Sequence, residues 1–467
     1  MNTQATDTSR LLGPWMCTAL VVGNMIGSGI FFLPASLAPY GLGNATSAWL
    51  FTASGAVLLA CVFAGLSRGL PGAAGPYAYT RMAFGELPAF LIAWGYWISV
   101  WTGNAAIATG GVAYLSNLFP AIGAPGVAPI VSLSVIWLLT GVNVLGARTA
   151  GGVQVATTVM KLIPLFIVAG VGLYLLLRGD ARIAVAVHAS SPVTLGAFTA
   201  AATLTLWPLL GFESANVATA RVRDASRVIP RATIMGAGLA AVVYIIASSA
   251  VQILIPADEL AKSTAPFADV VRIFFGDAVG RWIALFAVIS AFGALNGWTL
   301  LQGEVPYQLA RDGVFPRFFA VESRFHTPAR ALCLSSALVT GLVMLNYDKG
   351  LVEVFNFVLL ISSFSTLVLY FVCALAALQL LRTGRLPVAS GRTAVLAVCA
   401  LLGGGYALWA IVGAGISTDA QLCGGELLCW APWLKNPVYM GSVLIALGLP
   451  VYLAMRRGAR TTAASAP

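Results

Sequence analysis

Charged side chains are scarce in this sequence. They make up 9% of its 467 residues, whereas a soluble domain carries about 25%. Hydrophobic residues, in contrast, reach 59%. This shortage of charge excludes an ordinary soluble domain. It predicts an all-α, polytopic membrane protein, because helices satisfy their own backbone groups inside a bilayer.

Motifs that mark an enzyme or a metal site are also missing. The two histidines, His188 and His326, fall in predicted loops, and no Cys/His spacing typical of a metal site occurs. The sequence has no phosphate-binding glycine loop and no nucleophile elbow. We therefore expect no enzymatic activity, no bound metal and no cofactor. The alternation of apolar and polar residues that marks a β-barrel is absent as well.

What the sequence does contain is a series of long apolar stretches. A helix that crosses a bilayer needs ~20 such residues, and we count twelve stretches of this kind. The predicted spans are residues 11–35, 46–67, 88–117, 127–146, 154–177, 194–219, 234–255, 279–309, 331–347, 351–380, 393–414 and 437–455. Residues 1–10 and 456–467 remain as short tails, and no cleavable signal peptide is expected before the first span.

The basic residues are distributed unevenly. When alternate connections are assigned to opposite faces of the membrane, most of the 26 Lys and Arg residues, including Arg221, Arg223 and Arg227, fall on the side of both tails. Because basic residues accumulate on the cytoplasmic face, we expect both termini in the cytoplasm and the protein in the inner membrane. The asymmetry accounts for the net charge of +10 without a nucleic-acid partner. Cys423 and Cys429 then share an outer loop, where a disulfide and two free thiols are both compatible with the compartment.

Two predicted spans carry residues that interrupt helices. The first contains Gly27-Ser28-Gly29 at mid-depth, and the sixth contains Pro208. Glycine loosens a helix and proline removes one of its hydrogen bonds, so helices 1 and 6 are expected to be discontinuous. The alternative is that these small residues only serve helix packing.

Interruptions at corresponding positions of two halves are typical of inverted-repeat transporters. The first and sixth spans stand five spans apart, so each opens a group of five. The two repeats would be residues 11–177 and 194–380, and residues 393–455 would lie outside them.

Polar groups at mid-depth could bind a small substrate. Free N–H groups around Gly27, Ser28 and Gly29, with the Ser28 hydroxyl, suit a carboxylate. Glu213 is the only acid near the middle of a span, where an ionisable residue costs roughly 3 kcal/mol or more. It could gate, carry a proton, balance a cationic substrate, or only accept hydrogen bonds from nearby helix ends. Lys161 could replace a coupling ion, relay protons, or only extend to the interface.

Aromatic residues gather at the same depth. Trp101, Trp207, Trp298 and Tyr96 fall near mid-span, together with Asn104. Aromatic faces can close a pathway or hold a cation, and the Asn104 amide could accept a hydrogen bond from a cationic head group. Each aromatic residue taken alone could be a packing residue, so the expectation of a site depends on their common depth.

These segments resemble a known family. Residues 23–31, 101–104, 207–214 and 297–301 are similar to motifs of the amino acid–polyamine–organocation (APC) superfamily, and within it to the basic amino acid/polyamine antiporters, especially the arginine/agmatine exchangers. The resemblance implies a LeuT-like inverted repeat of five plus five helices with two further helices. It also implies exchange without ATP and, in many members, a homodimer.

The resemblance also implies roles for individual residues. Substrate-binding positions would be Met25, Gly27, Ser28, Gly29, Ser99, Val100, Asn104, Trp207, Leu210, Trp298 and Ser362. Gating or proton-linked positions would be Tyr77, Tyr96, Lys161, Glu213 and Tyr370. Within these sets, Trp298 corresponds to a middle gate and Tyr77 to a pH-linked tyrosine.

At three positions the sequence departs from the arginine-exchanger pattern, and these departures bear on which substrate is transported. Pro208 stands where the exchanger has a serine, Ser99 and Val100 replace an alanine–cysteine pair, and Lys161 replaces a small neutral residue. The sequence predicts a secondary antiporter that exchanges a cationic amino acid for its decarboxylated amine. The alternative is a proton-coupled permease for neutral amino acids, and a channel or a non-transporting sensor is the third hypothesis.

Overall fold

The chain folds into helices joined by short connections. The computed structural model describes residues 14–70, 75–124, 126–146, 150–180, 192–213, 224–346, 350–387, 390–422 and 436–464. Every regular element within these ranges is a helix, which agrees with the predicted all-α class. Cys423 and Cys429 lie outside the described residues, as do the predicted cytoplasmic segment 1–10 and the end of the sixth span.

The helices can be matched to the predicted spans one by one. The α-helices are α1 (Pro14–Met25), α2 (Ser28–Leu37), α3 (Gly41–Gly69), α4 (Gly75–Phe84), α5 (Glu86–Leu118), α6 (Val127–Val144), α7 (Ala150–Arg178), α9 (Leu195–Thr205), α11 (Ala225–Leu254), α12 (Ala257–Leu260), α13 (Pro266–Arg311), α14 (Ala329–Met344), α15 (Leu351–Arg382), α16 (Ser390–Leu422), α17 (Pro437–Ala446) and α18 (Gly448–Ala464). Short 3-10 helices are η2 (Ala38–Tyr40), η3 (Pro120–Gly123), η4 (Trp207–Leu209) and η6 (Arg317–Ala320). Each predicted span overlaps at least one helix.

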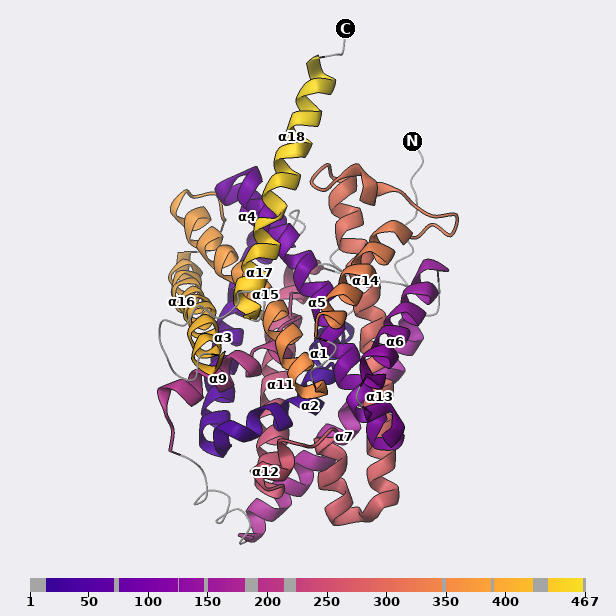
Figure 1. The fold of residues 1–467 in the computed structure, drawn as a ribbon. Helices are drawn as coiled ribbons and strands as arrows, with labels where there is room; N and C mark the ends of the chain where they lie inside the picture. The colour runs from indigo at the N-terminus through magenta and orange to yellow at the C-terminus, as the bar shows by residue number, and fades with distance from the viewer. Residues whose placement is uncertain are drawn as a thin grey trace.

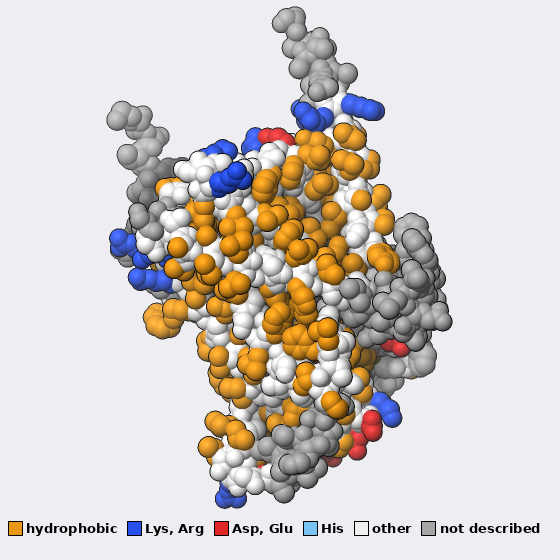
Figure 2. Space-filling model, turned by 90° about the vertical axis from the view of Figure 1, so that its left-hand side faces the viewer, with side chains coloured by type: hydrophobic (Ala, Val, Ile, Leu, Met, Phe, Trp, Pro, Cys, Tyr) orange, Lys and Arg blue, Asp and Glu red, His pale blue; other side chains and the backbone are white. Residues whose placement is uncertain are grey.

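The outer surface has the character of a membrane protein. Within the described residues, eight helices are long and apolar enough to cross a bilayer. Figure 2 shows a broad band of hydrophobic side chains over the middle of one face, with charged side chains toward its two ends. Such a band is what contact with lipid requires. The protein is therefore an integral, multi-pass membrane protein, whereas the count of twelve spans remains a prediction.

The first predicted span is interrupted, but the joint is shorter than the sequence indicates. α1 ends at Met25 and α2 begins at Ser28, so only Ile26 and Gly27 leave the helix. Gly27 has φ −107° and ψ −156°, an extended conformation. Ser28 and Gly29, which the sequence assigns to the joint, form the first turn of α2. Within the described residues no side chain caps α2, so the N–H groups at its start have no side-chain acceptor.

The sixth predicted span also leaves the helical conformation at mid-length. α9 ends at Thr205, and the turn η4 follows with Pro208 in its first residues. Leu210 is then extended, with ψ 160°, and Gly211 has φ 102°. This positive φ is one that glycine adopts without strain. The interruption falls at Pro208, as the sequence predicts, because proline cannot donate the next helical hydrogen bond.

The two interrupted segments meet beside α5. This helix runs through the centre of the molecule and packs along α13 and α15 (Figure 1). α2 contacts α5 and α13, and it also contacts α9 and η4. In Figure 1, α3, α9 and α16 lie on one side of this centre, and α6 and α13 lie on the other. The non-helical backbone of both segments is thus enclosed by helices, where it can line a cavity without facing lipid.

Candidate substrate-binding site

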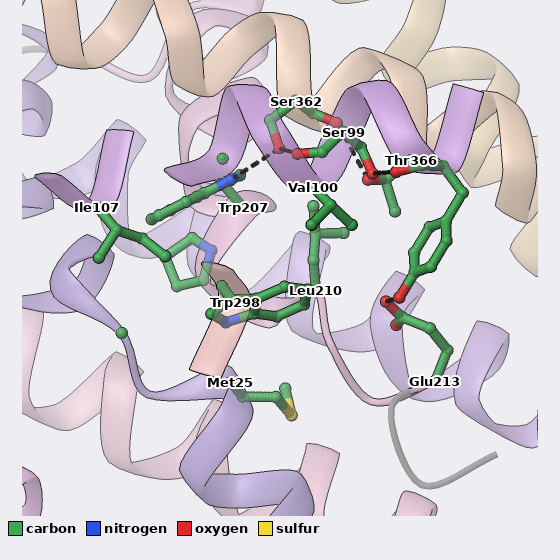
Figure 3. A pocket seen from close by; sticks show the side chains of 14 residues that line it. Met25, Ser99, Val100, Ile107, Trp207, Leu210, Glu213, Trp298, Ser362 and Thr366 are labelled. Carbon is green, nitrogen blue, oxygen red and sulfur yellow. Dashed lines mark hydrogen bonds between the residues drawn. The ribbon is translucent and has the colours of Figure 1, made fainter. Parts of the chain in front are cut away.

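A cavity lies where the two interrupted segments approach α5, α13 and α15 (Figure 3). It is lined by Met25, Gly27, Tyr96, Ser99, Val100, Gly103, Ile107, Trp207, Pro208, Leu210, Glu213, Trp298, Ser362 and Thr366. Its empty space, open mouth included, is about 500 Å³. Most of the wall is aromatic or aliphatic, as in a site that encloses a small organic ligand.

The predicted site residues divide into those that line this cavity and those that do not. On the wall are Met25, Gly27, Tyr96, Ser99, Val100, Trp207, Leu210, Glu213, Trp298 and Ser362. Behind it or away from it lie Ser28, Gly29, Tyr77, Asn104, Lys161 and Tyr370. The structure therefore brings residues from five predicted spans to one place.

Among the described residues, Glu213 is the only charged side chain on the cavity wall. It is 2% exposed. Its Oε2 accepts hydrogen bonds from the Tyr370 hydroxyl at 2.5 Å and from the Gly211 N–H at 3.0 Å, and its Oε1 accepts from the Tyr96 hydroxyl at 3.5 Å. These bonds fasten the segment after η4 to α5 and α15. Within the part of the chain that the structure describes, the wall carries this acid and no basic side chain, which suits a cationic ligand.

The Ser362 side chain holds the Trp207 indole on the opposite side of the cavity (Figure 3). The Trp207 Nε1–H donates to Ser362 Oγ at 3.3 Å, and the Ser362 hydroxyl donates to the Ser99 carbonyl at 2.7 Å. The Ser99 hydroxyl in turn donates to the Tyr96 carbonyl at 2.8 Å. Both serine protons are therefore engaged within the protein. Ser362 orients the indole, whose face can then contact a cation.

The first turn of α2 lies against this indole. A Cβ added to Gly29 would be only 2.4 Å from Cζ3 of Trp207, so the ring rests directly on the Gly29 backbone. Gly27 lines the cavity. The Ser28 side chain, which the sequence assigns to the substrate, packs instead toward Gly110 of α5. The groups that α2 presents to a ligand are therefore backbone N–H groups.

Asn104 also points away from its expected position. It is 1% exposed, and its Nδ2 donates to Oε1 of Gln302 on α13 at 2.7 Å. Within the described residues its Oδ1 has no hydrogen-bond partner. Asn104 thus lies behind the wall formed by its neighbour Gly103.

Lys161 stabilises the end of α1. Its side chain is 0% exposed, which excludes the interpretation that it extends to the membrane interface. Its Nζ donates to the Gly23 carbonyl at 3.1 Å. In an unbroken helix that carbonyl would accept from residue 27, but the Gly27 N–H bonds to Met25 instead. The ammonium therefore satisfies a carbonyl that the helix break leaves open, at the helix end where a cation is favourable.

Lys161→Met is expected to lower the thermal unfolding temperature of the purified protein and to weaken substrate binding. Methionine fills a similar volume, but it leaves the Gly23 carbonyl buried without a donor, which costs ~1–3 kcal/mol. Unfolding monitored in detergent checks this result. Lys262→Met, at a residue between α12 and α13, is the control. Equal stability of the Lys161→Met protein and the wild type would contradict this role of Lys161.

Tyr77 lies on α4, away from the cavity. Its hydroxyl donates to Glu86 Oε2 at 3.3 Å, and Arg81 pairs with the same carboxylate at 2.6 Å. Partial burial and the nearby Glu86 charge raise the pKa of the Tyr77 hydroxyl to about 12. The hydroxyl therefore stays protonated near neutral pH. A pH response at this position would have to act through its hydrogen bond to Glu86.

Some lining residues are missing from the predicted set. Gly103, Ile107 and Thr366 line the cavity, and the sequence analysis does not assign them to the site. Helical spacing contains the necessary signal, because Gly103 and Ile107 follow Val100 by three and seven residues, and Thr366 follows Ser362 by four. Pro208, predicted only as a helix breaker, lines the cavity as well.

The site has the features of a binding site for a small, charged organic molecule. Backbone N–H groups at the start of α2 suit a carboxylate, and Glu213 with the indoles of Trp207 and Trp298 suits a cation. Within the described ranges, no group of three His, Cys, Asp or Glu residues is placed to hold a metal ion.

Known proteins similar to this chain are transporters. Residues 12–428 match the model of a family described as amino acid permease. The chain is 34% identical over 407 residues to a Bacillus subtilis (strain 168) protein named as an arginine/ornithine antiporter, covering 81% of this chain and 86% of that protein. It is 34% identical over 343 residues to the cadaverine/lysine antiporter of Escherichia coli (strain K12), covering 73% and 76%. It is 29% identical over 428 residues to a putrescine transporter of Haemophilus influenzae, covering 91% and 96%.

Proposed function

The chain belongs to the amino acid permease family, and we propose that it is an antiporter that exchanges a cationic amino acid for the amine left by its decarboxylation. The named relatives are antiporters and transporters of amino acids and amines, and they support this kind of activity. The observation that carries the proposal is Glu213, which is the single charged side chain that the described residues bring to an otherwise neutral cavity wall. Arginine with agmatine is the first pair to test.

The cavity offers each part of such an amino acid a complementary group. The α-carboxylate would lie near Gly27, where the N–H groups and positive end of α2 are available. The cationic end would lie between the indoles of Trp207 and Trp298 and share the cavity with Glu213. A decarboxylated amine would keep the contacts of its cationic end with the two indoles and Glu213. It would lose the contacts of the carboxylate with the start of α2. Both substrates can thus occupy one site in turn, as exchange requires.

Transport would follow from movement around the two interrupted helices. In this proposal, the joint at Ile26 and Gly27 and the segment 206–213 change angle, while Trp298 and the Glu213–Tyr96–Tyr370 cluster close opposite routes. The proposed setting is the inner membrane, with twelve spans, a five-plus-five inverted repeat and both termini in the cytoplasm. A homodimer is compatible with this scheme but is not needed for it, because the cavity is built from one chain.

Exchange in reconstituted vesicles tests the proposed function. Vesicles loaded with agmatine, cadaverine, putrescine or ornithine should take up labelled arginine or lysine, and empty vesicles should not. The panel identifies the cargo pair, because only a matching internal amine accelerates uptake. No uptake of arginine, lysine, ornithine or a neutral amino acid under any loading would contradict the proposal.

The second candidate is a proton-coupled permease for neutral amino acids, which the buried Lys161 beside the helix break favours. This function predicts uptake of neutral amino acids into empty vesicles when the outside is acidic. It further predicts that Lys161→Ala abolishes the effect of the pH gradient. Strict dependence of uptake on an internal amine would exclude it.

A further inference from the structure

Three arginines meet at one end of the molecule without an acid between them. Arg68 lies in the last turn of α3, Arg231 in the second turn of α11 and Arg392 in the first turn of α16. All three residues are exposed. Within the described residues none of them forms an ion pair. Arg227, one turn earlier on α11, pairs with Asp224 instead.

α3 packs closely against α16, and the two helices run antiparallel. A Cβ added to Gly55 would be 2.4 Å from Cδ1 of Tyr406, and a Cβ added to Gly65 would be 2.6 Å from Cδ1 of Leu396. As the residue number rises along α3, the number of its partner on α16 falls. The end of α3 therefore lies beside the start of α16.

This packing makes the three arginines neighbours. Arg68 and Arg392 each lie about one helical turn beyond the last of these contacts. α11 also packs along α3, and near the start of α3 the Trp49 Nε1–H donates to Ser248 Oγ, near the end of α11, at 3.0 Å. The end of α3 therefore lies toward the start of α11, which carries Arg231. The positive charges of Arg231 and Arg392 both act on the Arg68 guanidinium.

A group of like charges on three packed helices favours a bound anion. Close guanidinium groups repel each other, and the described residues place no carboxylate among them to offset the repulsion. A phosphate would offset it, because its oxygens accept paired hydrogen bonds from the planar guanidinium fork. The chemistry of this patch therefore suits a phosphate group.

Exposed apolar side chains continue from two of the arginines along the outer surface. On α11, Met235 and Leu239 follow its arginine by four and eight residues, and on α16, Val395 and Leu402 follow its arginine by three and ten. All four are exposed, and this spacing keeps each pair on the face of its helix that carries the arginine. α3 packs against both helices and lies between them. The surface thus offers one basic patch and two apolar rows.

We propose that Arg68, Arg231 and Arg392 bind the phosphate of an anionic phospholipid whose two acyl chains lie along the apolar rows of α11 and α16. A soluble phosphate would contact the arginines alone, whereas a phospholipid matches the basic patch and both rows. The bound lipid would link α16 to α3 and α11. None of the three arginines lines the cavity, so this inference does not depend on the proposed substrate.

Binding of phosphatidylglycerol to the purified protein tests this site. Mass spectrometry of the intact protein–lipid complex measures the affinity. The wild type should bind phosphatidylglycerol more tightly than phosphatidylcholine with the same acyl chains, because the choline group cancels the phosphate charge. The triple variant Arg68→Gln/Arg231→Gln/Arg392→Gln should bind phosphatidylglycerol about 100-fold more weakly, because each basic group near an anionic lipid contributes roughly a factor of five. Its affinity for phosphatidylcholine should change little.

The matched control is Arg317→Gln/Arg324→Gln/Arg330→Gln. It removes the same charge from three exposed arginines that lie between α13 and α14 and in the first turn of α14, so it should bind phosphatidylglycerol as the wild type does. The single variant Arg392→Gln should lose roughly a factor of five, so the test does not depend on the folding of the triple variant. Without added lipid, the triple variant should unfold at no lower temperature than the wild type, because it loses only mutual repulsion.

Three results would overturn the inference. The first is equal affinity of the wild type, the triple variant and Arg392→Gln for phosphatidylglycerol. The second is an equal loss in the triple variant and in its control, which would show a general effect of net charge. The third is displacement of the bound lipid by inorganic phosphate alone, which would show that the arginines bind a soluble anion. None of these results bears on exchange, so the proposed function is tested separately.

Discussion

Gly29→Ala is expected to weaken substrate binding by about 10- to 100-fold. The added methyl group would lie 2.4 Å from Cζ3 and 2.6 Å from Cε3 of Trp207, closer than carbon atoms approach one another. The indole cannot move away freely, because it is hydrogen-bonded to Ser362 and packs edge-on against Phe355. Overpacking of this kind costs ~1–3 kcal/mol, and each 1.4 kcal/mol corresponds to a factor of ten. Calorimetric titration of the purified protein measures the loss.

Two other glycines provide comparisons for Gly29. Gly238→Ala on α11 adds a methyl group to open space and should leave binding unchanged. A Cβ at Gly27 also meets nothing within 4 Å, so Gly27→Ala should cause a smaller loss than Gly29→Ala although Gly27 lines the cavity. Wild-type affinity in Gly29→Ala would show that the position of the Trp207 ring does not matter for binding.

Glu213→Ala is expected to reduce exchange of cationic substrates by about 100-fold or more. The change removes the one charged side chain that the described residues place on the cavity wall. It also leaves the hydroxyls of Tyr96 and Tyr370 buried without their acceptor, and each unsatisfied group costs ~1–3 kcal/mol. Initial rates of labelled arginine or lysine uptake into amine-loaded vesicles provide the measurement.

Two further variants separate charge from hydrogen bonding at this position. Glu213→Gln keeps an acceptor for one tyrosine and loses the charge, so it should weaken binding of an amine dication more than binding of a zwitterionic amino acid. Glu322→Ala is the control, because Glu322 also accepts a hydrogen bond from a tyrosine, Tyr307, but lies outside the cavity. Full exchange activity in Glu213→Ala would reject the role of this carboxylate in binding and gating.

The helix breaks could be predicted from the sequence because their causes are local. Pro208 has no N–H to donate to a helical hydrogen bond, and the chain leaves α9 just before it, whereas Pro34 and Pro306 lie inside helices. The exact joint in the first span could not be predicted in the same way. It depends on which carbonyl of α1 is satisfied from outside, and Lys161 supplies that bond from 138 residues away.

The sequence predicted which residues meet at the site better than it predicted the directions of their side chains. Trp207, Glu213 and Trp298 could be grouped because each falls at mid-depth of an apolar span, and depth is set by sequence position. The direction of the Asn104 amide could not be predicted, because its partner stands 198 residues away in the sequence. The direction of the Ser28 side chain could not be predicted either, because it depends on where α2 begins. Ser28 lies in the first turn of α2 rather than in the joint, and its side chain packs toward α5.

A structure determined with a bound cationic amino acid tests the central claim most directly. The account predicts density for the ligand between α2 and Trp298, with its carboxylate within hydrogen-bond distance of N–H groups at the Gly27 joint and its cationic end in the part of the cavity that Glu213 faces. The first helix should remain interrupted at Ile26 and Gly27. A ligand bound elsewhere, or an unbroken helix from residue 14 to residue 37 with no space beside Trp207, would contradict it.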